Sequence, residues 1–438
     1  MSKSSLPTEL PRERAFLIGV ALRNKPGLLS LDDSLDELAL LADTAGMVVV
    51  GMLTQKLERP NAATFIGSGK VSELKNLVEE TVADSVIFDD ELTPRHQREL
   101  EKALGENVKV LDRTALILDI FAQHAFTSEG ALQVELAQYE YRLPRLTRQW
   151  THLARQAGGG GGRTGPGGGV GLRGPGETQL EVDRRDIGRR IDYLRTALKK
   201  VRAHRGRHRK RRQRASMPVV VFVGYTNAGK STLLNALTDA DVYVADQLFA
   251  TLDPTTKRVS LPNGQDILMS DTVGFIQKLP TALVAAFRAT LEEISEANIL
   301  LHLVDVTHSN AQEQAEAVVA TLDELEIENL PIVTVFNKTD ILQDRAALDQ
   351  LERDYPDSVE ISALRRIGLD ILLERIARLL DNSMSPIDVT LPYQEGHLVS
   401  LFYDNGQVDS VDHTDEGVQV SGKLPHRLLD RYRQFQTP

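Results

Sequence analysis

A glycine-rich loop set between an apolar run and a helical pattern constrains the fold of this chain more than any other feature. Residues 224–231 read GYTNAGKS, and they directly follow the apolar run 219–223. A strand, such a loop and a helix in this order form a P-loop, whose backbone amides curl around a β-phosphate. The lysine of a P-loop neutralises β- and γ-phosphate charge, and the serine hydroxyl coordinates Mg²⁺. We therefore predict an α/β nucleotide-binding domain with Lys230 in a catalytic role and Ser231 as a metal ligand.

A second element, Asp271-Thr-Val-Gly274, ends the strand predicted at 266–270. In phosphate-sensing switches the aspartate holds Mg²⁺ through water, and the glycine amide bonds the γ-phosphate. An Asp-x-x-Gly sequence is weak evidence alone, but here it follows the P-loop along the chain, as a switch requires. Gly274 is therefore predicted to act in catalysis by sensing the γ-phosphate.

A third element selects the base. An apolar strand pattern is followed by Asn337-Lys-Thr-Asp340. The two carboxylate oxygens of Asp340 match the ring N–H and exocyclic amine of guanine, a donor pair that adenine lacks. Asn337 is expected to bond the base edge and Lys338 to lie along the ring plane, while the loop at Ser362-Ala363 backs the base. The predicted ligands are GTP and GDP.

The segment between Ser231 and Asp271 is expected to donate a threonine to Mg²⁺ when the γ-phosphate is bound. The candidates are Thr251, Thr255 and Thr256. We favour Thr251, because it follows an apolar sequence that can anchor the loop.

Phe275 occupies the position after Gly274, where Ras-like switches place a glutamine that orients the attacking water. A phenylalanine ring neither accepts nor orients a proton. Intrinsic hydrolysis is therefore expected to be slow and to be completed by a partner or by another residue.

The chain before the P-loop begins with alternating short apolar runs and amphipathic stretches. Strands are predicted at 16–22, 47–53, 85–88 and 108–111, and helices at 31–42, 70–82 and 94–104. Such alternation is typical of a small, mostly parallel α/β domain.

Two coiled-coil seams follow this first region. They consist of Leu132, Leu136, Tyr139, Leu143 and Leu146, and of Ile187, Ile191, Leu194, Leu198 and Val201. Residues 158–176 between the seams are too rich in glycine to pack a core. We predict an antiparallel helical hairpin with a flexible tip loop, interrupted in its first helix at Pro144.

The sequence after the nucleotide domain alternates around Asn405-Gly406, which is a hairpin signal, and ends in a helical pattern near 426–435. The predicted fold class is α/β and multidomain. Its domains are an N-terminal α/β domain (1–126), the helical hairpin with a basic second helix (127–216), a P-loop GTPase domain (217–385) and a small C-terminal α+β domain (386–438).

Charge is distributed unevenly along the 438 residues, whose formal net charge is −11. Positive residues crowd the second hairpin helix and its exit, between Arg184 and Arg214. A solvated helical face is the usual explanation of a charge run, but a one-signed run in an acidic protein favours contact with a polyphosphate such as RNA. Arg163 and Arg173 in the tip loop would extend this contact.

These motifs resemble the HflX family, ribosome-associated translational GTPases of the TRAFAC class and the Obg-HflX-like group. The resemblance also includes Gly67-Ser-Gly-Lys70, the loop GPGETQ at 174–179 and FATLDPTT at 249–256, and it covers nearly the whole chain. It implies a GTPase that binds the large ribosomal subunit, places the glycine-rich tip near the peptidyl-transferase centre, and splits stalled or idle ribosomes under stress.

The resemblance also implies the residues that contact the nucleotide and the metal. Ser231 and Thr251 are the implied Mg²⁺ ligands, and Thr251 joins Lys230 and Gly274 in catalysis. The expected nucleotide contacts are Gly224, Tyr225, Thr226, Asn227, Ala228, Gly229, Lys230, Ser231, Thr232, Phe249, Ala250, Thr251, Leu252, Asp253, Asp271, Thr272, Val273, Gly274, Asn337, Lys338, Thr339, Asp340, Ser362, Ala363 and Leu364.

Two alternatives remain open at this point. One is a signalling or scaffold GTPase with protein partners, and the other is an RNA-remodelling ATPase activity of the N-terminal module, although Gly67-Ser-Gly-Lys70 lacks full P-loop spacing. The chain has no cysteine and no apolar run long enough to span a bilayer. We expect a monomer in the cytoplasm without an integral membrane segment, and leave peripheral membrane association open.

Overall fold

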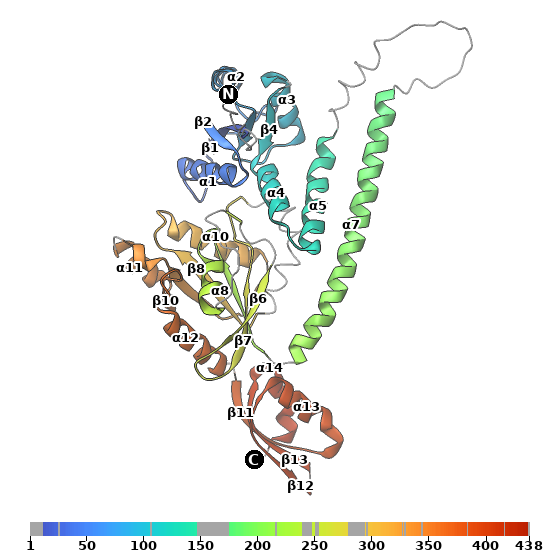
Figure 1. Ribbon diagram of the computed structural model, residues 1–438, viewed down its shortest axis with the longest axis vertical. Helices are drawn as coiled ribbons and strands as arrows, with labels where there is room; N and C mark the ends of the chain where they lie inside the picture. The colour runs from blue at the N-terminus through green and yellow to red at the C-terminus, as the bar shows by residue number, and fades with distance from the viewer. Residues whose placement is uncertain are drawn as a thin grey trace, which may run out of the picture. The chain divides into compact units, whose positions relative to one another are not determined.

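The computed structural model (Figure 1) describes residues 12–24, 27–105, 107–146, 175–214, 217–238, 248–249, 254–278, 294, 297–325, 327, 330–342, 345–382, 384–415 and 417–436. The chain divides into two compact units. The N-terminal unit comprises Met1–Lys199, Gln247–Leu252 and Gln277–Arg288, and the nucleotide unit comprises Lys200–Asp246, Asp253–Ile276 and Ala289–Pro438. The predicted division into four domains is finer than this and stays a prediction.

A four-stranded parallel sheet forms the core of the N-terminal unit. Its strands are β1 (Arg14–Leu22), β2 (Val48–Leu57), β3 (Ser85–Phe88) and β4 (Lys109–Asp112), in the order β2-β1-β3-β4. The helices α1 (Leu31–Thr44), α2 (Ser68–Thr81) and α3 (Pro94–Leu104) connect them. The predicted alternation is confirmed. Strand β3 is buried along its whole length, as expected for a parallel strand covered on both faces.

Helix α4 (Arg113–His124) follows β4 without a loop and lies beyond the predicted elements. Asp112 caps it, because its carboxylate accepts a hydrogen bond from the Ala115 amide at 2.9 Å. The same carboxylate accepts from the Tyr141 hydroxyl at 2.8 Å, which ties the next helix to the sheet.

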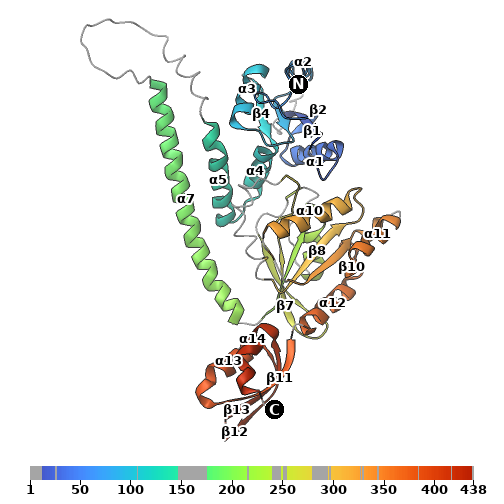
Figure 2. The same cartoon turned by 180° about the vertical axis from the view of Figure 1, so that it is seen from behind.

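The hairpin helices α5 (Ser128–Arg142) and α7 (Pro175–Arg214) lie side by side in both views (Figures 1 and 2). Their apolar contact is built from Leu132, Leu136, Tyr139, Leu143, Ile187, Ile191, Leu194 and Leu198. These positions of the two predicted seams are thereby confirmed. Helix α5 ends before the 3-10 turn η1 (Leu143–Arg145), because proline removes a backbone donor from the helix. Residues 158–174 of the predicted tip loop lie outside the described residues.

A six-stranded sheet forms the core of the nucleotide unit. Its elements are β5 (Val219–Gly224), α8 (Lys230–Thr238), β6 (Thr255–Ser260), β7 (Asp266–Asp271), β8 (Ile299–Asp305), α10 (Ala311–Glu324), β9 (Ile332–Asn337), η3 (Thr339–Ile341), α11 (Ala346–Asp354), β10 (Ser358–Glu360) and α12 (Leu369–Asn382). The strand order is β10-β9-β8-β5-β7-β6, and only the β6–β7 pair of these strands is antiparallel. Alternating strand residues supply two apolar clusters, one containing α8 and α12 and the other α10 and α11. The carboxyl ends of the parallel strands therefore meet at one edge, where ligands of such sheets bind.

A three-stranded antiparallel sheet follows helix α12 in the chain. Its elements are β11 (Met384–Leu391), η4 (Tyr393–Glu395), α13 (Gly396–Asn405), β12 (Gln407–Thr414), β13 (Gly417–Pro425), α14 (His426–Tyr432) and η5 (Arg433–Phe435), with strand order β11-β13-β12. The hairpin signal at Asn405-Gly406 was wrong, because that pair ends α13 and the β12–β13 turn lies further along the chain. Leu398 and Phe402, four residues apart, are both buried on one face of α13, and the Gly406 amide closes the helix on the Phe402 carbonyl at 2.8 Å. The predicted terminal helix is confirmed.

None of the helices in the described part of the chain is long and apolar enough to cross a membrane.

Candidate active site

The glycine-rich loop leaves β5 at Gly224 and enters α8 at Lys230. Gly224 and Gly229 have φ angles of 154° and 94°, a region that side chains disfavour. A Cβ on Gly224 would collide with the carbonyl of Leu303, and one on Gly229 with the amide of Asn337. Glycine is therefore required at both positions to bring the loop backbone this close to its neighbours.

Lys230 is buried at the start of α8, with 6% of its surface exposed. Its ammonium donates hydrogen bonds to the carbonyls of Gly224 at 3.2 Å and Tyr225 at 2.8 Å. Burial lowers the pKa of Lys230 to about 8, although the negative charge of Asp271 acts to raise it. The glycine-rich loop thus encloses a buried cation, and a polyphosphate is a ligand whose charge complements it.

Ser231 and Asp271 meet beside this cation. The Ser231 hydroxyl donates to the Asp271 carboxylate at 2.6 Å, and the adjacent Thr272 hydroxyl donates to the Phe222 carbonyl at 2.6 Å. The second bond fixes the Asp-x-x-Gly motif to β5. A hydroxyl and a carboxylate oxygen are hard donors that suit Mg²⁺. Among the described residues, no group of three or more histidine, cysteine or acidic side chains could hold a metal ion.

The backbone around Gly274 lies against the glycine-rich loop. The Thr226 amide donates to the Phe275 carbonyl at 2.8 Å, and the Phe275 amide donates to the Gly224 carbonyl at 3.1 Å. A Cβ on Gly274 would lie 2.8 Å from the Thr226 Cα and 3.1 Å from the Lys230 Nζ. Only glycine fits there.

Asn337, at the end of β9, bridges two loops with its side chain. Its amide donates to the Ala228 carbonyl at 2.9 Å, and its carbonyl oxygen accepts from the Ala363 amide at 2.9 Å. Lys338 next to it is held by an ion pair with Asp305 at 2.6 Å. Neither the bridge made by Asn337 nor the ion pair of Lys338 was predicted from sequence. Asp305 could have been identified as a residue of the site, because it directly follows the apolar residues of β8.

Several contacts of side chains hold the base-selecting loop. The Thr339 hydroxyl donates to the Ile361 carbonyl at 2.9 Å. Ser362 is fully buried, and its hydroxyl accepts from the Arg365 amide at 3.1 Å. The Asp340 carboxylate lies 3.7 Å from the Arg365 guanidinium. The predicted bonds from this loop to guanine stay predictions, and so does the assignment of Leu364, whose side chain is exposed.

The predicted metal-binding threonine lies outside the described residues, as do Ala250, Leu252 and Asp253 beside it. Thr255 and Thr256, the other candidates, belong to β6, where Thr256 shares a hydrogen bond with Ser270 at 3.1 Å. Phe249 belongs to the N-terminal unit, and its ring contacts Phe121 with centroids 4.6 Å apart.

The Gly67-Ser-Gly-Lys70 sequence forms the entry to helix α2. Gly67 is the N-cap, and its amide donates to the Gln55 side chain at 3.0 Å. The Lys70 ammonium pairs with Glu73 at 3.1 Å. These contacts are those of a helix-entry turn, which agrees with the lack of full P-loop spacing in this sequence.

A P-loop at the carboxyl edge of a parallel sheet, with an Asp-x-x-Gly motif and an Asn-Lys-x-Asp loop beside it, defines a P-loop GTPase. Family models agree along the chain: "GTP-binding GTPase N-terminal" at 32–122, "GTP-binding GTPase Middle Region" at 124–212, "50S ribosome-binding GTPase" at 219–338 and "HflX C-terminal domain" at 347–431. The chain binds GTP and GDP and hydrolyses GTP.

Relatives named GTPase HflX match over the full length. The protein from Caldanaerobacter subterraneus subsp. tengcongensis is 46% identical over 427 residues, which cover 98% of this chain and 95% of that one. The protein from Alkalihalophilus pseudofirmus is 46% identical over 429 residues, covering 95% and 97%. A crystal structure of an SsGBP and GDP complex is 25% identical with a TM-score of 0.46, covering 84% of this chain and 99% of that one. The chain belongs to the HflX family of GTPases.

Proposed function

We propose that this GTPase binds the large ribosomal subunit in its GTP-loaded state and dissociates stalled or idle ribosomes under stress. The observation that supports this most directly is the match of residues 219–338 to a family described as a 50S ribosome-binding GTPase. The same chain also carries the hairpin of α5 and α7, whose second helix runs from Pro175 to Arg214. Hydrolysis to GDP and phosphate then releases the protein.

Ser231 and Asp271 fit a Mg²⁺ ion, directly and through water, and Thr251 is the proposed third group of this chain. Mg²⁺ bound there would neutralise charge on the β- and γ-phosphate oxygens. Lys230 holds the same phosphates from the glycine-rich loop, and the Gly274 amide bonds the γ-phosphate. Asp340 selects guanine.

Hydrolysis proceeds by in-line attack of water on the γ-phosphate. Phe275 is buried, with 4% of its surface exposed, and carries no group that can orient this water. The chain's own residues therefore position the phosphates and stabilise their charge, but leave the water without a glutamine. This arrangement supports slow intrinsic turnover, and we propose that the ribosome stimulates it.

The proposed rRNA contact is the solvent-facing side of α7. Arg190 and Arg195 pair across the hairpin with Glu135 and Glu140 at 2.7 and 2.8 Å. Several further cations of α7 face solvent: Arg184, Arg185, Arg189, Lys199 and Lys200. Contact between such cations and phosphates releases counterions, so ribosome affinity should fall steeply with added salt.

Sedimentation with purified ribosomes tests the proposal. With a non-hydrolysable GTP analogue, the full chain should migrate with the large subunit, and with GDP it should not. A variant lacking residues 158–176 should still bind the nucleotide but fail to split ribosomes. Co-migration that ignores the nucleotide would contradict docking in the GTP-loaded state. GTPase stimulation by protein fractions in place of large subunits would instead indicate a signalling or scaffold GTPase. We further propose a monomeric, cytoplasmic protein.

A further inference from the structure

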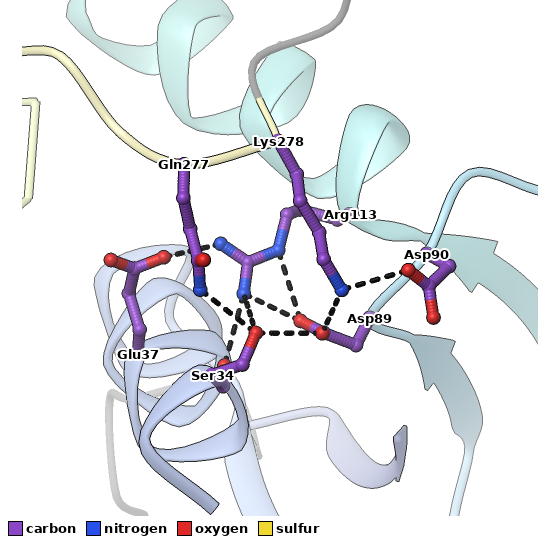
Figure 3. Close-up of polar contacts among 7 residues, drawn as sticks. All are labelled: Ser34, Glu37, Asp89, Asp90, Arg113, Gln277 and Lys278. Atoms are coloured by element: carbon purple, nitrogen blue, oxygen red, sulfur yellow. Dashed lines mark hydrogen bonds and ion pairs between the residues drawn. The ribbon is translucent and has the colours of Figure 1, made fainter. Parts of the chain in front are cut away.

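A buried polar cluster lies in the N-terminal unit. Asp89 follows β3 and Arg113 begins α4; they are 0% and 1% exposed. The Arg113 guanidinium contacts Asp89 at 2.5 Å, pairs with Glu37, and donates to the Ser34 carbonyl at 2.9 Å. The Ser34 hydroxyl donates to Asp89 at 2.7 Å. Figure 3 shows these side chains converging from α1, β3 and α4.

The two buried carboxylates of this cluster are matched by an equal number of cations only when Lys278 is counted. Without it, the carboxylates of Asp89 and Glu37 face the single guanidinium of Arg113, and buried charges are costly unless paired. The Lys278 ammonium lies 2.5 Å from Asp89 and 2.7 Å from Asp90. Burial acts to raise the pKa of Asp89, but the charges of Arg113 and Lys278 outweigh it and keep that pKa below its ordinary value.

Gln277 and Lys278 enter this cluster together, as Figure 3 shows. The Gln277 side-chain amide donates to the Ser34 hydroxyl at 2.8 Å. Lys278 adopts a left-handed φ of 54°, which is unfavourable for a residue with a side chain and persists only where the surroundings hold it. The contacts with Asp89 and Asp90 supply that restraint.

The segment of Gln277 and Lys278 follows directly on residues that contact the glycine-rich loop. Phe275, which precedes it, is bonded through both its amide and its carbonyl to Gly224 and Thr226 of the glycine-rich loop. A short stretch of chain is therefore fixed by the glycine-rich loop at one end and by the N-terminal cluster at the other. Phe249, from the segment that carries Thr251, also belongs to the N-terminal unit, where its ring contacts Phe121.

We propose that Ser34, Asp89, Asp90 and Arg113 form a receptor site for the segment after Gly274, and that Lys278 is a positioning residue which holds Phe275 against the glycine-rich loop. Movement of the Gly274 amide onto a γ-phosphate has to work against this restraint, so the docked segment favours GDP over GTP. By reciprocity, GTP weakens the docking. The inference rests on the proposed role of Gly274 and is independent of the ribosome.

The test is titration of the purified full chain, in magnesium, with GDP and with a non-hydrolysable GTP analogue. In Lys278→Met the ratio of the analogue Kd to the GDP Kd should fall about tenfold, corresponding to about 1.4 kcal/mol. Lys278→Arg keeps the charge and should stay within about twofold of wild type. Asp90→Asn removes the more exposed partner, and should shift the ratio about threefold in the same direction.

Lys109→Met is the matched control, because Lys109 also belongs to the N-terminal unit and pairs with Glu13 at 2.9 Å. It should leave the ratio unchanged. Combining Lys278→Met with Asp90→Asn should add little to Lys278→Met alone, because both changes break one contact. An unchanged ratio in Lys278→Met, an equal weakening of both nucleotides, or an equal shift in the control would overturn the proposal. No ribosomes are present, so failure of ribosome splitting cannot produce any of these results.

Discussion

Replacing Asn337 with alanine should disconnect the glycine-rich loop from the base-selecting loop. Asn337 is buried, with 2% of its surface exposed. Its side chain donates a hydrogen bond to the Ala228 carbonyl and accepts one from the Ala363 amide, both at 2.9 Å. Alanine leaves both backbone groups buried without this partner. Each such loss costs about 1–3 kcal/mol, so the pair costs about 2–6 kcal/mol.

Part of this energy should appear in binding, because the two loops are no longer held together before the nucleotide arrives. We expect the GDP Kd to rise at least about tenfold, measured by calorimetric titration, and the Ala363 amide to lose protection in hydrogen exchange. The control is Asn298→Ala, since the Asn298 side chain also accepts from a backbone amide, that of Val219 at 2.9 Å, but at the start of β5. A protected Ala363 amide together with wild-type GDP affinity in Asn337→Ala would refute this reasoning.

Three further changes probe the same site. Asp340→Asn should reduce preference for guanine over other bases at least about tenfold, because a carboxylate acceptor of two donors is lost; retained GTP selectivity in competition binding would contradict the base assignment. Lys230→Ala should abolish nucleotide-dependent behaviour, checked by GTP turnover and by nucleotide titration. Burial and the charge of Lys230 lower the pKa of His302 from 6.5 to about 4. The folded protein therefore disfavours protonated His302, and the free energy of unfolding should fall as the pH is lowered from 6.5 toward 4. The loss should reach up to about 3 kcal/mol. His302→Leu should flatten this acid dependence in urea denaturation, and an unaltered pH profile would argue against it.

Local patterns predicted much of the fold. The strands of the N-terminal sheet are short apolar runs separated by amphipathic helices, and the seams of α5 and α7 repeat an apolar spacing that only a helix satisfies. The hairpin predicted at Asn405-Gly406 was wrong because the local sequence carries two competing signals. The same pair that favours a tight hairpin turn also ends a helix, and the helical spacing of Leu398 and Phe402 was the competing signal.

Contacts between distant residues were beyond reach of such patterns. Lys278 and Asp89 are 189 positions apart, and neither residue type at its position signals an ion pair. The hydrogen bonds by which Asn337 joins two loops could not be predicted from the sequence for another reason. Its motif predicts a bond to the base, and gives no sign that the side chain also joins Ala228 to Ala363. Sequence therefore predicted a set of nucleotide contacts, and the structure adds the contacts that some of these residues make with one another.

GTP hydrolysis by the full chain, measured alone and with purified large ribosomal subunits, tests the central claim most directly. Because Phe275 supplies no water-orienting group, turnover alone should be slow, and large subunits should raise it by at least about a hundredfold, as expected when a partner completes such a site. Small subunits at the same concentration should have little effect. Equal rates with and without large subunits would contradict the proposed role on the ribosome.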